Sequence, residues 1–335
     1  MKLGFDKLKE ITLGAVRVEE TDGAVAFFRF TEEQQRFYAT NKDGLYKKTF
    51  ATAGVKMRFK TDGTALRLKY RARQASSRLF FAADVFADGA FRGGFGNCSG
   101  IKSDANYIKQ SFPFGDFYGE VFLGEGEKEV SVYFPWSAVM EITEAELVGA
   151  TFVSAVKPTK KMLVFGDSIT QGYDAIRPSK RYAARLADAL GAEEINKAIG
   201  AEIFVPELAA LADDFKPDYI SVAYGTNDWS KTEFSDFKER CEKFFFNLYK
   251  NYKGSKIFAL APLWRKDYAV PRMGWEFEKV AETIKAAAEK YESTEFIDCF
   301  GFIPPDENNF SDRYLHPNDK GFDFYAENLA SKIVK

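Results

Sequence analysis

The sequence predicts two structural parts: an antiparallel β-sandwich of jelly-roll type over residues 1–157, and a parallel sheet flanked by helices over residues 158–335. The first observation is length, because 335 residues exceed the roughly 100–200 residues of one typical domain. The second is a change of pattern near Pro158. Short alternating strands with glycine turns precede it, whereas short apolar runs and helical patterns alternate after it.

Strict alternation of side chains predicts the N-terminal strands. Apolar and cationic residues alternate over 55–60 and again over 66–71, with a Thr-Asp-Gly-Thr turn between them. Alternation places the apolar side chains on one face of a strand, so this segment predicts a hairpin with one dry and one basic face. Further strands are expected at 25–30, 79–86, 121–123 and 130–134, and no long helix is expected before Lys160. Many short strands with glycine turns favour a sandwich.

The C-terminal half alternates strands with helices. The continuous apolar run at 162–165 predicts a strand covered on both faces. The remaining strands are expected at 195–198, 219–224, 257–261 and 295–298, and the helices at 183–190, 205–211, 234–248, 277–284 and 322–333. This order predicts a parallel sheet wrapped by helices on both sides. A functional site is then expected at the carboxyl ends of the strands.

Composition excludes several classes of function. The chain has 47 Lys+Arg against 49 Asp+Glu, and a net charge of −2 offers no electrostatic attraction for nucleic acid or an anionic membrane. The charges in MKLGFDKLKE leave no room for an apolar signal core, and no run approaches the roughly 18 apolar residues of a membrane span. Three scattered cysteines cannot build a disulfide framework or a zinc site. We therefore expect a soluble, cytoplasmic protein without nucleic-acid or membrane partners.

A single histidine limits the chemistry. Any mechanism that needs an imidazole must use His316, and multi-histidine metal sites are excluded. A lone histidine is usually a satisfied core or surface residue. His316, however, lies in a polar loop before the last helix, with Asp312 nearby, where packing does not demand it.

A serine follows the first C-terminal strand in the sequence Gly166-Asp167-Ser168. On a sharp strand-to-helix turn its hydroxyl is exposed at the sheet edge and its N–H points into the start of the helix, which suits a nucleophile and an oxyanion donor together. The alternative is that Asp167 or Ser168 only caps the helix, a common role for both residue types.

Two other strand ends carry candidate oxyanion donors. Asn227 follows the strand at 219–224 and can donate its side-chain amide to a developing oxyanion. The loop with Gly200 and Ala201 follows the strand at 195–198 and can offer a backbone N–H. Taken singly, the first could be an Asx turn and the second a helix-entry turn.

The combination of these motifs is specific. Strand-Gly-Asp-Ser, strand-Asn-x-x-x-Gly, strand-Gly-Thr-Asn-Asp and a terminal His-Pro-Asn follow in that order. The C-terminal half thereby resembles the SGNH (GDSL-type) serine hydrolases, with the motifs spread over roughly residues 160–335. The resemblance implies a flavodoxin-like parallel sheet and no metal or cofactor. By position, the resemblance implies that Ser168 is the nucleophile and His316 the base. The oxyanion donors that it implies are the Ser168 N–H, the Gly200-Ala201 loop and Asn227.

Two positions depart from the family pattern. The oxyanion glycine of the family stands five residues after the motif asparagine, where this chain has Ala201 after Gly200; we expect the Ala201 N–H to donate and Gly200 to supply the bend. The family acid stands three residues before the histidine, where this chain has Arg313. We expect Asp312, four residues before the histidine, to be the acid, and it reaches the imidazole only across a one-residue bulge. Otherwise a main-chain carbonyl orients the ring, as in some carbohydrate esterases of this type.

A sandwich ahead of such a domain is similar to the architecture of acetylxylan-type carbohydrate esterases and of a related acyltransferase. The resemblance implies a serine esterase that hydrolyses short acyl groups, acetyl above all, on a small-molecule or oligosaccharide ester. Two alternatives stay open: an acyltransferase with the same serine and histidine, and a non-catalytic carbohydrate-binding protein. The acyl group, the alcohol and the oligomeric state are left open by the sequence.

Overall fold

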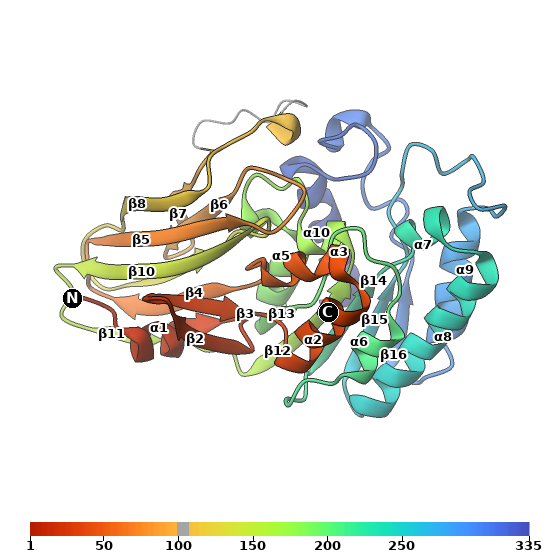
Figure 1. Cartoon of the computed structure of the whole chain (residues 1–335), viewed down its shortest axis with the longest axis horizontal. Helices are drawn as coiled ribbons and strands as arrows, with labels where there is room; N and C mark the ends of the chain where they lie inside the picture. Colours follow the sequence, from red (N-terminus) through yellow and green to blue (C-terminus); the bar gives the residue numbers. More distant parts are fainter. Residues whose placement is uncertain (99–106, 335) are drawn as a thin grey trace.

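The computed structural model describes residues 1–98 and 107–334 and contains an N-terminal antiparallel part beside a C-terminal parallel α/β part (Figure 1). Two antiparallel sheets form the N-terminal part. Sheet A has the order β2 (Arg17–Thr21), β3 (Ala24–Phe28), β10 (Ala138–Val148), β5 (Ala65–Gln74), β8 (Gly115–Phe122). Sheet B has the order β1 (Thr12–Leu13), β4 (Lys56–Thr61), β9 (Lys128–Tyr133), β6 (Ala82–Ala87), β7 (Ala90–Gly96), with β11 (Val153–Ala155) on β4. Apolar side chains of both sheets share one core, which confirms the predicted sandwich.

The expected hairpin over 55–71 is wrong. β4 pairs with β1, β9 and β11 in sheet B, whereas β5 pairs with β10 and β8 in sheet A. The turn between them is therefore a corner at which the chain crosses from one sheet to the other. Alternation indicates that each strand has one buried face, but it does not say which strand lies beside it.

The expectation of no long helix before Lys160 is also wrong. The N-terminal part contains α1 (Phe5–Ile11), α2 (Glu32–Asn41), α3 (Asp43–Tyr46) and the 3₁₀ turn η1 (Lys47–Phe50). α2 begins with a capping box between Thr31 and Gln34, yet its buried face carries Gln34, Gln35 and Tyr38. An apolar periodicity cannot reveal a helix whose buried face is mainly polar.

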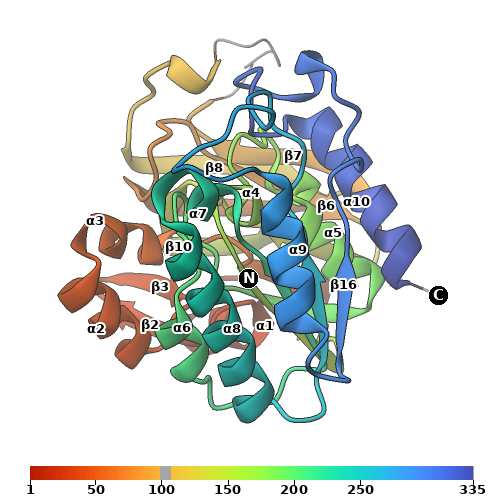
Figure 2. The same ribbon diagram turned by 90° about the vertical axis from the view of Figure 1, so that its right-hand side faces the viewer.

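The C-terminal part is the expected parallel sheet. Its strand order is β13 (Ala192–Asn196), β12 (Lys160–Gly166), β14 (Tyr219–Ala223), β15 (Lys256–Leu260), β16 (Thr294–Ile297), the flavodoxin-like order 2-1-3-4-5. Its main helices are α5 (Tyr182–Ala189), α6 (Pro206–Ala210), α8 (Phe234–Asn251), α9 (Glu278–Ala288) and α10 (Asp319–Ile333), with short α4 (Ser168–Gln171) and α7 (Thr226–Lys231). One core includes residues of α6, α8 and α9 and another includes residues of α5 and α10, so helices cover both faces. Figure 2 shows α8 and α9 side by side.

The two parts share a core along α2. Phe30 and Tyr38 are fully buried in the same apolar cluster as Leu163 and Phe165 of β12. The chain order reverses at β12, which lies between β13 and β14, so the crevice expected for a ligand is at the carboxyl ends of β12 and β14. Among the described residues, no helix is long and apolar enough to cross a membrane.

Candidate active site

Ser168 lies at the carboxyl end of β12, as the sequence predicts, and is the first residue of α4. The capping role falls to Asp167, whose carboxylate accepts from the Ile169 N–H at 3.0 Å. Gly166 makes this sharp turn sterically possible, because a Cβ there would lie 2.2 Å from Thr170 Oγ1. The Ser168 hydroxyl is consequently free for another partner, although the residue is only 5% exposed.

That partner is the single histidine. Ser168 Oγ lies 2.9 Å from His316 Nε2, and His316 Nδ1 lies 2.7 Å from Asp312 Oδ2. The second Asp312 oxygen accepts from the N–H groups of residues 314, 315 and 316 at 2.8–3.1 Å. Arg313 has a φ of +56°, so the chain makes the extra left-handed step that a one-residue bulge requires. This turn brings a carboxylate four residues before the histidine to the imidazole.

Burial and hydrogen bonding act in opposite directions on this pair. Burial alone would raise the pKa of Asp312, but the hydrogen bond and charge of His316, with the backbone N–H groups, lower it to about 2. Burial alone would lower the pKa of His316, but the hydrogen bond to Asp312 and the charges of Asp174 and Asp312 raise it above its usual value. The aspartate is therefore ionised at neutral pH and stabilises an imidazolium.

A second carboxylate that the sequence did not predict also faces the imidazole. Asp174 is fully buried, and its Oδ2 lies 4.0 Å from His316 Nδ1. Arg78, in the connection from β5 to β6, donates to both of its oxygens at 2.6 and 2.9 Å, and Ser311 Oγ donates to Oδ2 at 2.6 Å. The N-terminal part thus contributes an arginine to the surroundings of the histidine. Neither Asp174 nor Arg78 belongs to a motif of the sequence, so no local signal pointed to either residue.

Asp174, Asp312 and His316 are close enough for their ligand atoms to approach one metal ion, within 4.8 Å of one another. Each carboxylate oxygen, however, already accepts from a protein donor: Arg78 and Ser311 on the first aspartate, His316 and backbone N–H groups on the second. The donor set therefore fits a hydrogen-bonded acid–histidine pair better than a cation site.

The loop after β13 distinguishes its two candidate donors. The Gly200 N–H donates to Gln171 Oε1 at 2.7 Å, whereas the Ala201 N–H has no acceptor within the described residues. The left-handed bend also differs from the expectation, because it falls on Ala201 (φ +74°) and not on Gly200. Gly200 serves close packing instead: a Cβ there would lie 2.5 Å from the Tyr173 ring.

Asn227 and the serine backbone complete this arrangement. One Asn227 amide hydrogen is donated to the Glu202 carbonyl at 3.0 Å, which fixes the side chain and leaves the other hydrogen free. The Ser168 N–H has no acceptor among the described residues. The carboxyl ends of β12, β13 and β14 thus present three donors, Ser168 N–H, Ala201 N–H and Asn227 Nδ2, of the kind an oxyanion requires.

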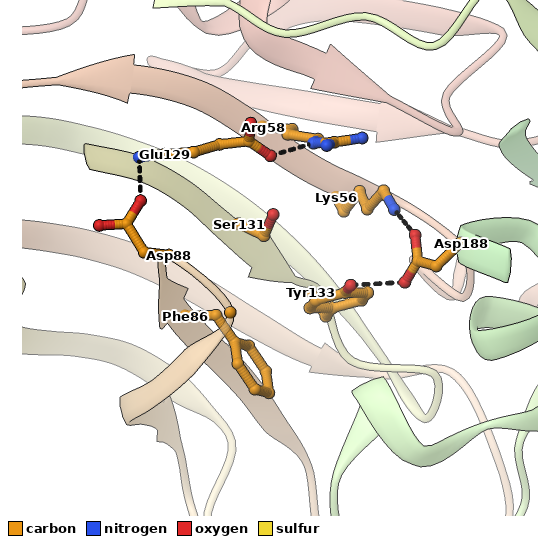
Figure 3. A pocket seen from close by; sticks show the side chains of 9 residues that line it. Lys56, Arg58, Phe86, Asp88, Glu129, Ser131, Tyr133 and Asp188 are labelled. Atoms are coloured by element: carbon orange, nitrogen blue, oxygen red, sulfur yellow. Dashed lines mark hydrogen bonds and ion pairs between the residues drawn. The ribbon is translucent and has the colours of Figure 1, made fainter. Parts of the chain in front are cut away.

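A larger hollow lies away from this site. This groove on sheet B has a volume of about 490 Å³. Lys56 and Tyr133, which line it, both donate to Asp188 of α5 (Figure 3). The lining contains neither Ser168 nor His316. Lys56 Nζ lies 5.1 Å from the centre of the Tyr133 ring, so a protein cation already occupies a position over that ring. The side chains of this groove therefore connect the N-terminal and C-terminal parts of the chain, and the nucleophile lies elsewhere.

Comparison with known proteins agrees with this geometry. Residues 164–324 match the model of the GDSL-like lipase/acylhydrolase family. No curated protein matches the sequence.

Among solved structures, the salicylyl-acyltransferase SsfX3 from a tetracycline biosynthetic pathway is 20% identical, with a TM-score of 0.77 over 96% of this chain and 93% of that one. A putative GDSL-like lipase from Bacteroides ovatus is 20% identical, with a TM-score of 0.74 over 97% and 95%. A family two carbohydrate esterase from Cellvibrio japonicus is 15% identical, with a TM-score of 0.66 over 99% and 96%. At these identities the similarity establishes the two-part fold.

Proposed function

We propose that this chain, a carboxylic ester hydrolase whose residues 164–324 form a GDSL-like lipase/acylhydrolase domain, removes short acyl groups, acetyl above all, from carbohydrates. The observation that carries the proposal is the chain of contacts from Ser168 Oγ through His316 to Asp312, at 2.9 and 2.7 Å. A nucleophile, a base and an orienting acid within hydrogen-bond reach are the requirement for acyl transfer to serine.

In the proposed mechanism His316 Nε2 accepts the Ser168 proton as Oγ attacks the acyl carbonyl carbon. The carbonyl oxygen becomes an oxyanion and accepts hydrogen bonds from Ser168 N–H, Ala201 N–H and Asn227 Nδ2. His316 then gives the proton to the departing alcohol oxygen, which leaves an acyl-enzyme. Water attacks that ester with His316 as the base, and the carboxylic acid departs while Ser168 recovers its proton. Asp312 holds the imidazole in the tautomer that has its proton on Nδ1.

The substrate class rests on two observations. The sandwich and the parallel sheet together match a family two carbohydrate esterase over 99% of this chain, which supports a sugar as the alcohol. An acetyl xylan esterase from the rumen bacterium Butyrivibrio proteoclasticus shares the fold over 84% of this chain and 88% of that one, at 16% identity and a TM-score of 0.57, which supports acetyl as the acyl group.

The test is hydrolysis of 4-nitrophenyl acetate, butyrate and octanoate by the wild type and by Ser168→Ala. The proposal expects acetate to be preferred and Ser168→Ala to lose turnover. Turnover that rises with acyl length would overturn the short-acyl assignment. Equal turnover by Ser168→Ala would mean that the ester cleavage does not come from the Ser168 site. Carbohydrate binding without catalysis would then be the function of that site.

An acyltransferase is the second candidate, because the salicylyl-acyltransferase shares the two-part fold over 96% of this chain. Both activities pass through the same acyl-enzyme and differ only in whether water or an alcohol attacks it. Added sugar acceptors discriminate the two. Transfer that outcompetes hydrolysis at modest acceptor concentration favours the transferase, and unchanged release of free acid favours the hydrolase.

A further inference from the structure

A lysine from the N-terminal part contacts the loop that follows β13. Lys48, in η1, donates from Nζ to the main-chain carbonyl of Gly200 at 2.7 Å. That carbonyl and the N–H of Ala201 belong to one peptide unit. A cation bound to the carbonyl oxygen polarises the unit, and this strengthens its N–H as a donor. The N–H that becomes a stronger donor is that of Ala201, which has no acceptor among the described residues.

A buried arginine holds this lysine in place. Arg29 is fully buried and donates to the carbonyl of Lys48 at 3.0 Å and to that of Ala51 at 2.6 Å. The same guanidinium donates to the carbonyls of Asn196 and Ala198, at 2.8 and 2.7 Å, at the end of β13. η1 and the loop after β13 are therefore tied to one side chain. The position of Lys48 relative to the Gly200 carbonyl is thus set by buried contacts as well as by its own hydrogen bond.

A second lysine provides a comparison within the same loop. Lys231 Nζ donates to the carbonyl of Ala201 at 2.7 Å, which is the next peptide unit. The N–H of that unit belongs to Glu202 and donates to the Ile199 carbonyl at 3.1 Å, so it is not available to a substrate. The two lysines thus bind the carbonyls of adjacent peptide units. Only the unit bound by Lys48 has an N–H, that of Ala201, without an acceptor among the described residues.

Neither ammonium is neutralised by a nearby carboxylate. Within the described part of the chain, neither Lys48 nor Lys231 forms an ion pair, and each ammonium donates to a main-chain carbonyl instead. Burial first, and then the charge of Lys231, lower the pKa of Lys48, while the charge of Glu202 opposes this. The ammonium of Lys48 therefore interacts with the Gly200–Ala201 peptide and not with a carboxylate.

We propose that Lys48 is a positioning residue of the oxyanion hole: its ammonium fixes and polarises the Gly200–Ala201 peptide, so that the Ala201 N–H donates to the oxyanion. The inference rests on the proposed esterase function. It makes the N-terminal part a component of the catalytic machinery, because the parallel sheet alone lacks this cation.

The test compares Lys48→Met, Lys48→Arg and Lys231→Met in the full chain, with melting temperature measured for each. With 4-nitrophenyl acetate, Lys48→Met is expected to lower kcat by about 10-fold or more with little change in KM, a fraction of the roughly 10²–10³-fold cost of losing a whole donor. Lys48→Arg keeps a cationic donor and should restore most of kcat. Lys231→Met should leave kcat within about two-fold of the wild type, because it acts on the neighbouring peptide.

An NMR measurement separates failure of this inference from failure of the esterase function. The Ala201 amide proton should move upfield in Lys48→Met and stay in place in Lys231→Met, whether or not any ester is cleaved. Absence of Ser168-dependent turnover in the wild type would overturn the function alone. Three results would overturn the role of Lys48: an unmoved Ala201 resonance, equal effects of both methionine variants, or a raised KM at constant kcat, which would make Lys48 a substrate contact.

Discussion

Replacing Arg78 with Gln should move the acid limb of the pH–rate profile to higher pH. Arg78 neutralises the buried carboxylate of Asp174, whose Oδ2 lies 4.0 Å from His316 Nδ1. Without the guanidinium, this carboxylate faces the imidazole with its charge uncompensated. An anion at that distance stabilises the imidazolium, so the pKa of His316 rises further above its usual value. The neutral imidazole that accepts the serine proton is then available only at higher pH.

The distance sets the size of the effect. Two unit charges 4 Å apart interact by about 4 kcal/mol at an effective dielectric constant of about 20, which corresponds to roughly three pKa units at 1.36 kcal/mol per unit. This is an upper bound, because the Ser311 hydroxyl also donates to the Asp174 carboxylate and solvent will reach the vacated space. We expect a rise of about one unit for Arg78→Gln and a fall of about the same size for Asp174→Asn. Asp312 and Asp167, which also interact with the imidazole, are unchanged in both variants.

The assay is kcat/KM for 4-nitrophenyl acetate as a function of pH on both sides of the usual histidine pKa of about 6.5. The matched control is Arg73→Gln, which removes an arginine of the same strand–loop region that pairs with Glu141 instead. An acid limb that stays in place in Arg78→Gln, or moves to lower pH, would contradict this prediction, provided that the melting temperature is unchanged. A shift of equal size in the control would also refute it.

The remaining predictions concern the acid, the amide donor and the close-packed glycine. Asp312→Ala should lower kcat by on the order of 10²-fold or more, because the imidazole loses its orienting acid; a near-normal rate would mean that another group orients the ring. Asn227→Ala should lower kcat by roughly 10²–10³-fold with a smaller change in KM, measured in the same steady-state assay; a change confined to KM would contradict its place at the oxyanion. Gly200→Ala should destabilise the fold by about 1–3 kcal/mol in denaturant unfolding, because the new Cβ meets the Tyr173 ring at 2.5 Å; unchanged stability would mean that the ring moves without cost.

The sequence was sufficient for the parallel sheet and for the residues at its strand ends. Its strands are continuous apolar runs and its helices amphipathic, so each element has a local pattern, and motif order then places Ser168, Asn227 and His316 at one edge. The sandwich strands were also visible as alternation. Their partners were not, because β4 and β5 alternate alike while belonging to different sheets.

The contributions of the N-terminal part to the site could not be predicted. Arg78 and Lys48 lie in connections whose local sequence carries no motif, and they reach the site only through the packing of the two parts. The left-handed bend at Ala201 was misplaced to Gly200 for a related reason, and the bulge at Arg313 was only one of two alternatives that the sequence offered. A positive φ at a residue other than glycine is imposed by tertiary contacts and not by the residue itself.

The most direct test of the account is to find the acyl group on the enzyme. The wild type would be quenched in acid during turnover of 4-nitrophenyl acetate, digested and examined by mass spectrometry, with Ser168→Ala as the control. We expect one added acetyl group on the peptide that contains Ser168, and none in the variant. An acetyl group on another residue, or ester cleavage that persists at the wild-type rate in Ser168→Ala, would contradict it.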